Sequence, residues 1–187
     1  LTSRELIAEI LEELEVEYKP GSKQKLLSQL NRYLINQLAQ NMNIVLIIDE
    51  AQNLSPSVLE EVRMLSNLET EREKLIQIIL IGQPQLKKKL ENIKLEQFRQ
   101  RIAVYYHLNP LSKQETGEYI LHRLKLASQN GVDIFSKEAI EAIYSHSRGI
   151  PRIINLVCDS ALLSGYITET KVITEQMMRE IIKERDF

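Results

Sequence analysis

The sequence predicts an α/β fold, a parallel sheet flanked by helices, in its first part and an all-helical bundle in its second. Two apolar runs that do not alternate, 44–48 and 75–81, are typical of strands buried on both faces of a parallel sheet. Helical periodicity separates these runs, and only helical patterns follow Asn109-Pro110. We therefore divide the chain into an α/β core, 1–109, and a helical lid, 110–187.

Capping residues predict where the helices begin. Thr2 and Ser112 each open a capping box with a Glu three residues later, and Ser55 is followed by Pro56 at a first helical position. The helix from Ser112 should stop at Asn130-Gly131. A third, shorter strand is expected over 103–108. Four further helices are expected after Pro84 and from Ser22, Ser136 and Thr174, and a fifth opens at Gly149-Ile150-Pro151.

The composition excludes several classes of protein. Charged residues make up 27% of the chain, which is ordinary for a globular protein, and the formal net charge of -2 gives no general reason to expect nucleic-acid or membrane-surface binding. The longest apolar runs are far too short to span a bilayer. Cys158 is the only cysteine, so no intramolecular disulfide can form, which is compatible with a reducing compartment.

Two carboxylates, Asp49 and Glu50, directly follow the first apolar run. In open α/β sheets, ligands bind outside the carboxyl ends of the strands. Asp49 is suited to hold Mg²⁺ there, directly or through water, because this ion takes one or two carboxylates together with phosphates. Glu50 is suited to orient and deprotonate the water that attacks a γ-phosphate. This is the Walker B pattern, and the alternative is a pair of strand-end acids that cap the next turn.

Gln83 follows the second apolar run, in the stretch Gly82-Gln83-Pro84. If the two strands are neighbours, its amide emerges beside Asp49 and Glu50, where it could hydrogen-bond the attacking water or a γ-phosphate oxygen. The alternative is a turn residue that satisfies backbone groups, and on Gln83 alone we favour that alternative.

Three arginines are candidates for phosphate contacts, because guanidinium groups bind phosphate in a bidentate manner. Arg99 and Arg101 precede the expected third strand, and one of them could act as an arginine finger on a nucleotide held by a neighbouring subunit. Arg152 lies in the first turn of the helix opened by Pro151, where it could reach a γ-phosphate and couple the position of the lid to the nucleotide state. For each arginine the alternative is a solvated helix end.

Five segments in order resemble AAA+ ATPases of the general secretion pathway A type, the ExeA/GspA-like family of P-loop NTPases. Segment 47–54 (IIDEAQNL) is similar to the Walker B segment, 80–86 (LIGQPQL) to sensor 1, and 149–155 (GIPRIIN) to sensor 2. Segments 98–102 (FRQRI) and 108–111 (LNPL) are similar to the block between the two sensors. ATPases that assist DNA transposition share much of this pattern.

The resemblance implies a AAA+ core with a helical lid, binding of ATP and Mg²⁺, and self-association. It implies Asp49 as the metal-side acid, Glu50 as the catalytic base, Gln83 at sensor 1, Arg152 at sensor 2, and Arg99 or Arg101 near the finger position. It further implies a role in type II secretion with an inner-membrane secretion partner, in a parent protein that is cytoplasmic or associated with the inner membrane. Nucleic acid is a partner we do not favour.

The sequence departs from the family at the phosphate-binding loop. A Walker A motif needs a Gly-rich loop with a Gly-Lys pair, and none of the six glycines is followed by Lys. We therefore expect an N-terminally truncated domain that lacks Walker A and the first, central strand of the sheet. We also expect the exposed sheet position to be covered by something else, such as another copy of the chain.

These observations leave three hypotheses open. In the first, the parent protein is an ATPase that couples ATP hydrolysis to assembly of a secretion machinery, and this chain alone hydrolyses ATP poorly or not at all. In the second, the chain is an interaction module that kept the fold and lost nucleotide turnover. In the third, it belongs to a DNA-transposition AAA+ ATPase, which salt-dependent DNA binding would reveal.

Overall fold

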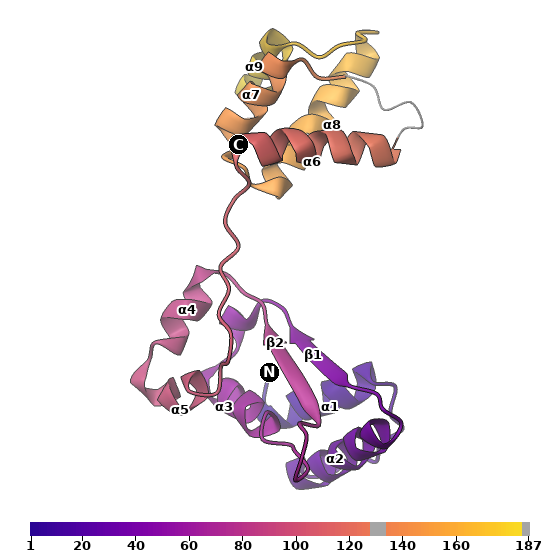
Figure 1. Ribbon diagram of the computed structural model, residues 1–187, viewed down its shortest axis with the longest axis vertical. Helices are drawn as coiled ribbons and strands as arrows, with labels where there is room; N and C mark the ends of the chain where they lie inside the picture. Colours follow the sequence, from indigo (N-terminus) through magenta and orange to yellow (C-terminus); the bar gives the residue numbers. More distant parts are fainter. Residues whose placement is uncertain (128–133, 185–187) are drawn as a thin grey trace. The chain divides into compact units, whose positions relative to one another are not determined.

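The computed structural model describes residues 1–127 and 134–184, and two compact units divide the chain. The first unit is Leu1–Tyr105 and the second is Tyr106–Phe187 (Figure 1). The first unit contains a two-stranded sheet and its covering helices, whereas the described part of the second contains helices and one isolated β-bridge, Phe135–Ile173. The predicted fold class, α/β followed by an all-helical part, is therefore confirmed.

The sheet consists of β1 (Ile44–Ile48) and β2 (Ile76–Leu80), which lie side by side in parallel (Figure 1). Helix α3 (Pro56–Leu65) makes the crossover between them. The register places Ile44 opposite Ile76 and Ile48 opposite Leu80. Because the pairing is parallel, both strands end at the same edge of the sheet.

One face of the sheet packs on the core of the first unit. Ile44, Leu46 and Ile48 of β1 and Ile78 and Leu80 of β2 contact a cluster of buried side chains. Those side chains come mainly from α1 (Ser3–Glu13), α2 (Lys23–Ala39) and α3. Ile7, Leu11, Leu30, Leu34 and Leu59 are fully buried in this cluster. Burying each such side chain contributes about 1.5–3 kcal/mol, so this face anchors the sheet.

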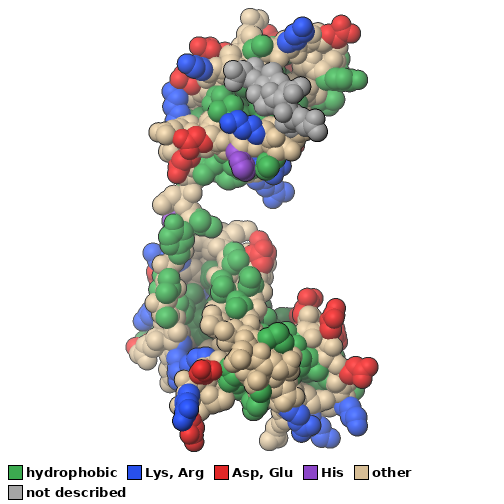
Figure 2. All heavy atoms as spheres, turned by 45° about the vertical axis from the view of Figure 1, so that its right-hand side comes forward, with side chains coloured by type: hydrophobic (Ala, Val, Ile, Leu, Met, Phe, Trp, Pro, Cys, Tyr) green, Lys and Arg blue, Asp and Glu red, His purple; other side chains and the backbone are tan. Residues whose placement is uncertain are grey.

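The opposite face of the sheet is exposed, so the prediction that both faces are buried was wrong. Val45, Ile47 and Ile79 are 47%, 58% and 47% exposed, and they alternate with buried or partly buried residues along each strand. Figure 2 shows hydrophobic side chains at the surface of this unit. The same apolar residues fit a strand buried on one face or on both, and none of the described residues of the first unit covers these side chains.

The predicted third strand was also wrong. Residues 103–108 form no ladder, and Tyr106 and Leu108 are 85% and 80% exposed. A strand needs a neighbour for its backbone groups, whereas the described sheet contains only β1 and β2, each paired with the other. Residues 103–108 therefore form no strand, because no described strand pairs with them.

Short elements complete the first unit, and most predicted helix starts are confirmed. The helices α4 (Pro84–Leu90) and α5 (Glu96–Arg99) follow the sheet, with single turns at Ala51–Asn53 (η1) and Ile93–Leu95 (η2). Thr2 forms the predicted capping box with Glu5, and Ser22 and Ser55 cap α2 and α3.

The second unit is built from four described helices, α6 (Lys113–Ala127), α7 (Lys137–Ser147), α8 (Pro151–Ile167) and α9 (Glu175–Glu184). Ile143, Ile154 and Met178 are fully buried between them. The predicted capping box of α6 is present: the Ser112 N–H donates to Glu115 Oε2 at 2.8 Å, and the Glu115 N–H donates to Ser112 Oγ at 3.3 Å. The predicted stop at Asn130-Gly131 lies outside the described residues.

None of the helices that the structure describes is long and apolar enough to cross a membrane.

The turn before α8 depends on Gly149. Its φ of +77° lies in the left-handed region, and it follows Arg148, which is also left-handed at +51°. The Leu111 N–H donates to the Gly149 carbonyl at 2.9 Å. A Cβ at Gly149 would lie 1.8 Å from the Leu111 carbonyl oxygen, which is backbone and cannot move aside. This contact fixes the start of α8, the helix that carries Arg152 in its first turn.

We predict that Gly149→Ala lowers the free energy of unfolding of the second unit by about 2 kcal/mol or more, because it adds backbone strain and a clash. Urea unfolding followed by NMR signals of the second unit would measure the change. Gly117→Ala in α6 is the matched control, since its Cβ would meet only Ile140 Cγ2 at 3.6 Å. It should raise stability by roughly 0.5–1 kcal/mol. A neutral Gly149→Ala would contradict the proposed constraint.

Candidate functional site

The carboxyl ends of β1 and β2 bring two predicted segments together. After the last ladder pair, the Ile81 N–H donates to the Ile48 carbonyl and the Ala51 N–H donates to the Ile81 carbonyl, both at 2.9 Å. Asp49 and Glu50 leave β1 at this point, and Gly82-Gln83 leave β2. The sheet edge where ligands bind in α/β folds therefore carries two carboxylates and an amide.

Asp49 and Glu50 form a tight turn whose side chains are exposed. The Glu50 N–H donates to Asp49 Oδ1 at 2.7 Å. Glu50 itself adopts the left-handed conformation, with φ 52° and ψ 32°. Non-glycine residues in this conformation cost of order 1 kcal/mol or more and concentrate at functional sites. Both residues are exposed, so both are available to a ligand.

Gln52 links the two strand ends. Its Nε2 donates to Glu50 Oε2 at 2.5 Å, and its Oε1 accepts the backbone N–H of Gln83 at 3.1 Å. Sequence reasoning placed Gln52 inside the Walker B stretch and gave it no role. The available signal was an amide two residues after the candidate base, close enough in a single turn to reach back to it.

Gln83 lies beside the acids, as the neighbouring strands predicted. It is the N-cap of α4, and its side chain makes no capping hydrogen bond. Its backbone N–H donates to the Gln52 amide, which places Gln83 in the same hydrogen-bonded group as Glu50. The Gln83 side chain is exposed at this edge of the sheet.

Arg99 and Arg101 lie in the first unit, at and just after the end of α5, and both are exposed. The structure shows no hydrogen bond from either guanidinium to Asp49 or Glu50. The hydrogen bond from Lys74 is the main cause of the lowered pKa of the Glu69 carboxyl, and Arg101 lies close enough to lower it slightly further. An arginine finger acts on a neighbouring subunit, so this position within one chain leaves that role a prediction.

Arg152 belongs to the second unit. It is exposed, in the first turn of α8, directly after Pro151. The structure describes each unit by itself, so the contact of Arg152 with a nucleotide stays a prediction.

Known proteins resemble this chain in sequence and in fold. A family model for the AAA domain matches residues 2–90. General secretion pathway protein A of Aeromonas hydrophila is 44% identical over 167 residues, which cover 89% of this chain and 30% of that protein. Residues 2–90 therefore form an AAA domain, and most of the chain is similar to general secretion pathway protein A. The chain spans about a third of the length of the curated relative.

Solved structures with the same AAA+ fold share little sequence with the chain. Cdc6p from Pyrobaculum aerophilum has a TM-score of 0.74 at 20% identity, covering 98% of this chain and 50% of that chain. The ORC2 protein of Aeropyrum pernix has a TM-score of 0.69 at 17% identity, with the same coverage. The RuvB Holliday junction branch migration motor of Thermotoga maritima has a TM-score of 0.60 at 17% identity, covering 97% of this chain and 57% of that chain.

The residues at this edge fit the metal of the Mg–nucleotide complex that AAA+ ATPases use, but not its phosphates. Within 1–127 and 134–184, no cluster of three or more His, Cys, Asp or Glu side chains could hold a metal alone. Mg²⁺ does not require one, because it takes one or two carboxylates and completes its shell with phosphates and water. Exposed Asp49 fits that need. The phosphate cradle is not supplied, since the chain has no Gly-Lys pair.

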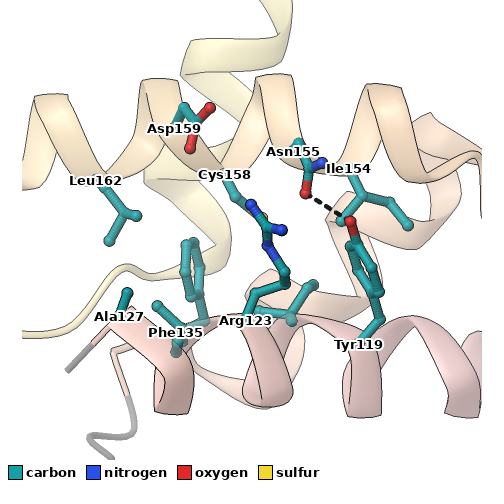
Figure 3. A pocket seen from close by; sticks show the side chains of 11 residues that line it. Tyr119, Arg123, Ala127, Phe135, Ile154, Asn155, Cys158, Asp159 and Leu162 are labelled. Atoms are coloured by element: carbon teal, nitrogen blue, oxygen red, sulfur yellow. Dashed lines mark hydrogen bonds between the residues drawn. The ribbon is translucent and has the colours of Figure 1, made fainter. Parts of the chain in front are cut away.

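A separate hollow of about 130 Å³ lies in the second unit, between α6 and α8 (Figure 3). Tyr119 spans it and donates its hydroxyl to Asn155 Oδ1 at 3.0 Å. Cys158 lines the same hollow, and burial, helped by Asp159, raises the pKa of its thiol to about 12. The hollow contains neither the predicted acids nor Arg152, so it is distinct from the candidate site.

We predict that Cys158 reacts slowly with a thiol reagent at pH 8. The pKa rises from 9.0 to about 12, so the native protein holds roughly 1,000-fold less thiolate than an exposed cysteine. Because a more basic thiolate is a better nucleophile, the net slowing should be about 30- to 60-fold. Release of the chromophore from Ellman's reagent measures the rate.

Two controls apply to this measurement. The same protein unfolded in urea should react at the rate of a free thiol, and so should Ser145→Cys in a Cys158→Ala background, because Ser145 is exposed on α7. Equal rates for native and unfolded protein would mean that the thiol is not buried as described.

Proposed function

We propose that this chain is the catalytic-acid and sensor portion of an ATPase domain that works in secretion. The observation that carries the proposal is the meeting of Asp49, Glu50 and Gln83 at one edge of a parallel sheet. The AAA+ fold and the 44% identity to general secretion pathway protein A support it. The likeness to Cdc6p, ORC2 and RuvB is below 25% identity and supports the fold alone, so a DNA-linked role gains nothing from it.

Each residue at the edge would have a separate task. Asp49 would hold Mg²⁺, which neutralises charge on the transferred phosphoryl group when it is bound. Glu50 would accept the proton of the attacking water, through the oxygen that Gln52 leaves open. The Gln83 amide would orient that water or a γ-phosphate oxygen from the second strand. In this proposal the strand ends fix the backbone that carries the three groups. Catalysis by proximity requires such fixed positions.

The phosphate cradle would come from a segment upstream of these residues in the gene. Its loop would follow a strand, as phosphate-binding loops do, and that strand would pair beside the open sheet. Arg152 would contact the γ-phosphate from the lid, and Arg99 or Arg101 would reach the site of a neighbouring copy. The resemblance supports self-association, an inner-membrane secretion partner, and a cytoplasmic or membrane-associated location for the parent protein.

A second candidate is an interaction module that binds no nucleotide. The lack of any Gly-Lys pair favours it, because a P-loop lysine and its loop supply most of the contacts to the β- and γ-phosphates. The two candidates differ in whether an upstream extension restores binding of Mg-ATP.

We predict that this 187-residue chain binds Mg-ATP weakly or not at all, and that a version extended upstream in the gene binds it. Titration calorimetry on the two proteins side by side measures the difference. In the extended version, Glu50→Gln should lower kcat by about 100-fold or more with little change in nucleotide affinity, because it removes the proton acceptor and keeps the side-chain volume.

Gln85→Glu in α4 is a control that changes charge near the site without touching Glu50, and its kcat should stay within about twofold of wild type. If neither version binds Mg-ATP, the interaction module is the better description. If the 187-residue chain binds alone, the phosphates are held by groups other than those proposed, and this account of the site fails.

A further inference from the structure

We propose that Gln52 is a positioning residue that couples the catalytic base Glu50 to the sensor segment at Gln83. The inference rests on the proposed function, since it assigns Glu50 and Gln83 the roles argued above. Gln52 makes no contribution of its own to phosphate or metal binding in this proposal. It acts through the two groups that its side chain joins.

The side-chain amide of Gln52 has a defined orientation. Its Nε2 faces the Glu50 carboxylate at 2.5 Å, and its Oε1 faces the Gln83 N–H at 3.1 Å. Turning the amide over would set its oxygen against the carboxylate and its NH₂ against a donor, so both contacts would become repulsive. One amide therefore satisfies an acceptor that follows β1 and a donor that follows β2, and this donor lies 31 residues from Gln52.

The surrounding residues hold Gln52 in place before any ligand binds. Ala51 is fully buried, and its N–H donates to the Ile81 carbonyl. Lys89 of α4 donates to the carbonyl of Gln52 and, at 2.8 Å, to that of Leu54. The turn that carries Gln52 is thus fixed from both sides, and the side chain needs no backbone movement to reach Glu50.

Gly82 provides the space for this contact. A Cβ at Gly82 would lie 2.7 Å from Gln52 Oε1 and 3.3 Å from the Gln52 backbone nitrogen. The φ of Gly82 is not in the left-handed region, so backbone conformation does not require a glycine here. Close packing favours the glycine instead, because a Cβ would meet the Gln52 amide first and Leu86 Cδ2 next, at 3.1 Å.

The bridge would have two consequences for the reaction. One hydrogen bond to Oε2 fixes the direction of the Glu50 carboxylate and leaves Oε1 for the proton of water. The second bond means that a movement of Gln83, when it contacts a γ-phosphate, displaces the same amide that holds Glu50. Gln52 thereby makes the placement of the base depend on the sensor.

The bridge itself can be tested in the 187-residue chain without nucleotide. Gln52→Met keeps the length of the side chain and removes both hydrogen bonds. The Gln83 amide signal in ¹H–¹⁵N NMR should move upfield, and its hydrogen exchange should become about 5- to 10-fold faster, as expected for loss of one hydrogen bond. Gln85→Met is the matched control: Gln85 is exposed on α4, the helix that Gln83 caps, and this change should leave the Gln83 amide signal in place.

The coupling is tested in the extended version that hydrolyses ATP. Gln52→Met should lower kcat by on the order of 10- to 100-fold and leave KM within about twofold, because a misplaced base affects the chemical step and not nucleotide binding. In a Glu50→Gln background, Gln52→Met should lower kcat no further, since the group through which it acts is already gone. Gln52→Glu should be at least as slow as Gln52→Met, because it sets a second negative charge against Glu50.

The outcomes separate this inference from the proposed function. If Glu50→Gln abolishes turnover and Gln52→Met does not, the ATPase proposal stands and the positioning role is overturned. An additive loss in the double variant, or a rise in KM without a fall in kcat, would also overturn it. If Gln52→Met leaves the Gln83 amide unchanged, the bridge is absent in solution. If Glu50→Gln has no effect on turnover, the proposed function fails first, and the role of Gln52 in it fails as well.

Discussion

The candidate site depends on two backbone hydrogen bonds beyond the last residues of the ladder. The Ile81 N–H reaches the Ile48 carbonyl, and the Ala51 N–H reaches the Ile81 carbonyl. Each contributes only about 1 kcal/mol net, yet together they fix how the chain leaves both strands. Without them, Glu50 and Gln83 would share an edge of the sheet but not a defined distance. The pairing register of β1 and β2 therefore also fixes how the residues that follow the two strands lie relative to each other.

Local sequence signals predicted the elements well and their surroundings poorly. Capping residues such as Thr2, Ser55 and Ser112 act within one turn, so their effect is visible in sequence. Burial of the outer sheet face is different, because Val45 and Ile47 have the same character whether covered or exposed. The segment 103–108 failed for the same reason: strand propensity was present, but a strand also needs a partner that no local pattern provides.

The two acids of the candidate site were predictable because residues able to bind a metal stand in the sequence where a strand ends. Asp49 and Glu50 follow an apolar run directly, and strand ends are where ligands bind. Gln52 was not predictable in the same way. Its amide meets a backbone group 31 residues away, and the space for that meeting comes from a missing side chain at Gly82. The role of Gln52 depends on the missing side chain of Gly82, so the residues next to Gln52 in sequence carry no pattern that predicts it.

The open sheet and the missing phosphate cradle are consistent with one cause. An exposed apolar face and an unpaired strand-like segment are features that proteins normally cover, because they promote association. In a parallel α/β sheet, a phosphate-binding loop follows a strand, so a segment that supplied the loop would also bring a strand. Such a strand would pair with an edge of the sheet and could give 103–108 a neighbour, and the helix that follows a phosphate-binding loop would pack on a face of the sheet. A second copy of this chain could cover the exposed sheet face but would not supply a Gly-Lys pair. Binding of Mg-ATP, and not association alone, therefore distinguishes an upstream segment from a second copy.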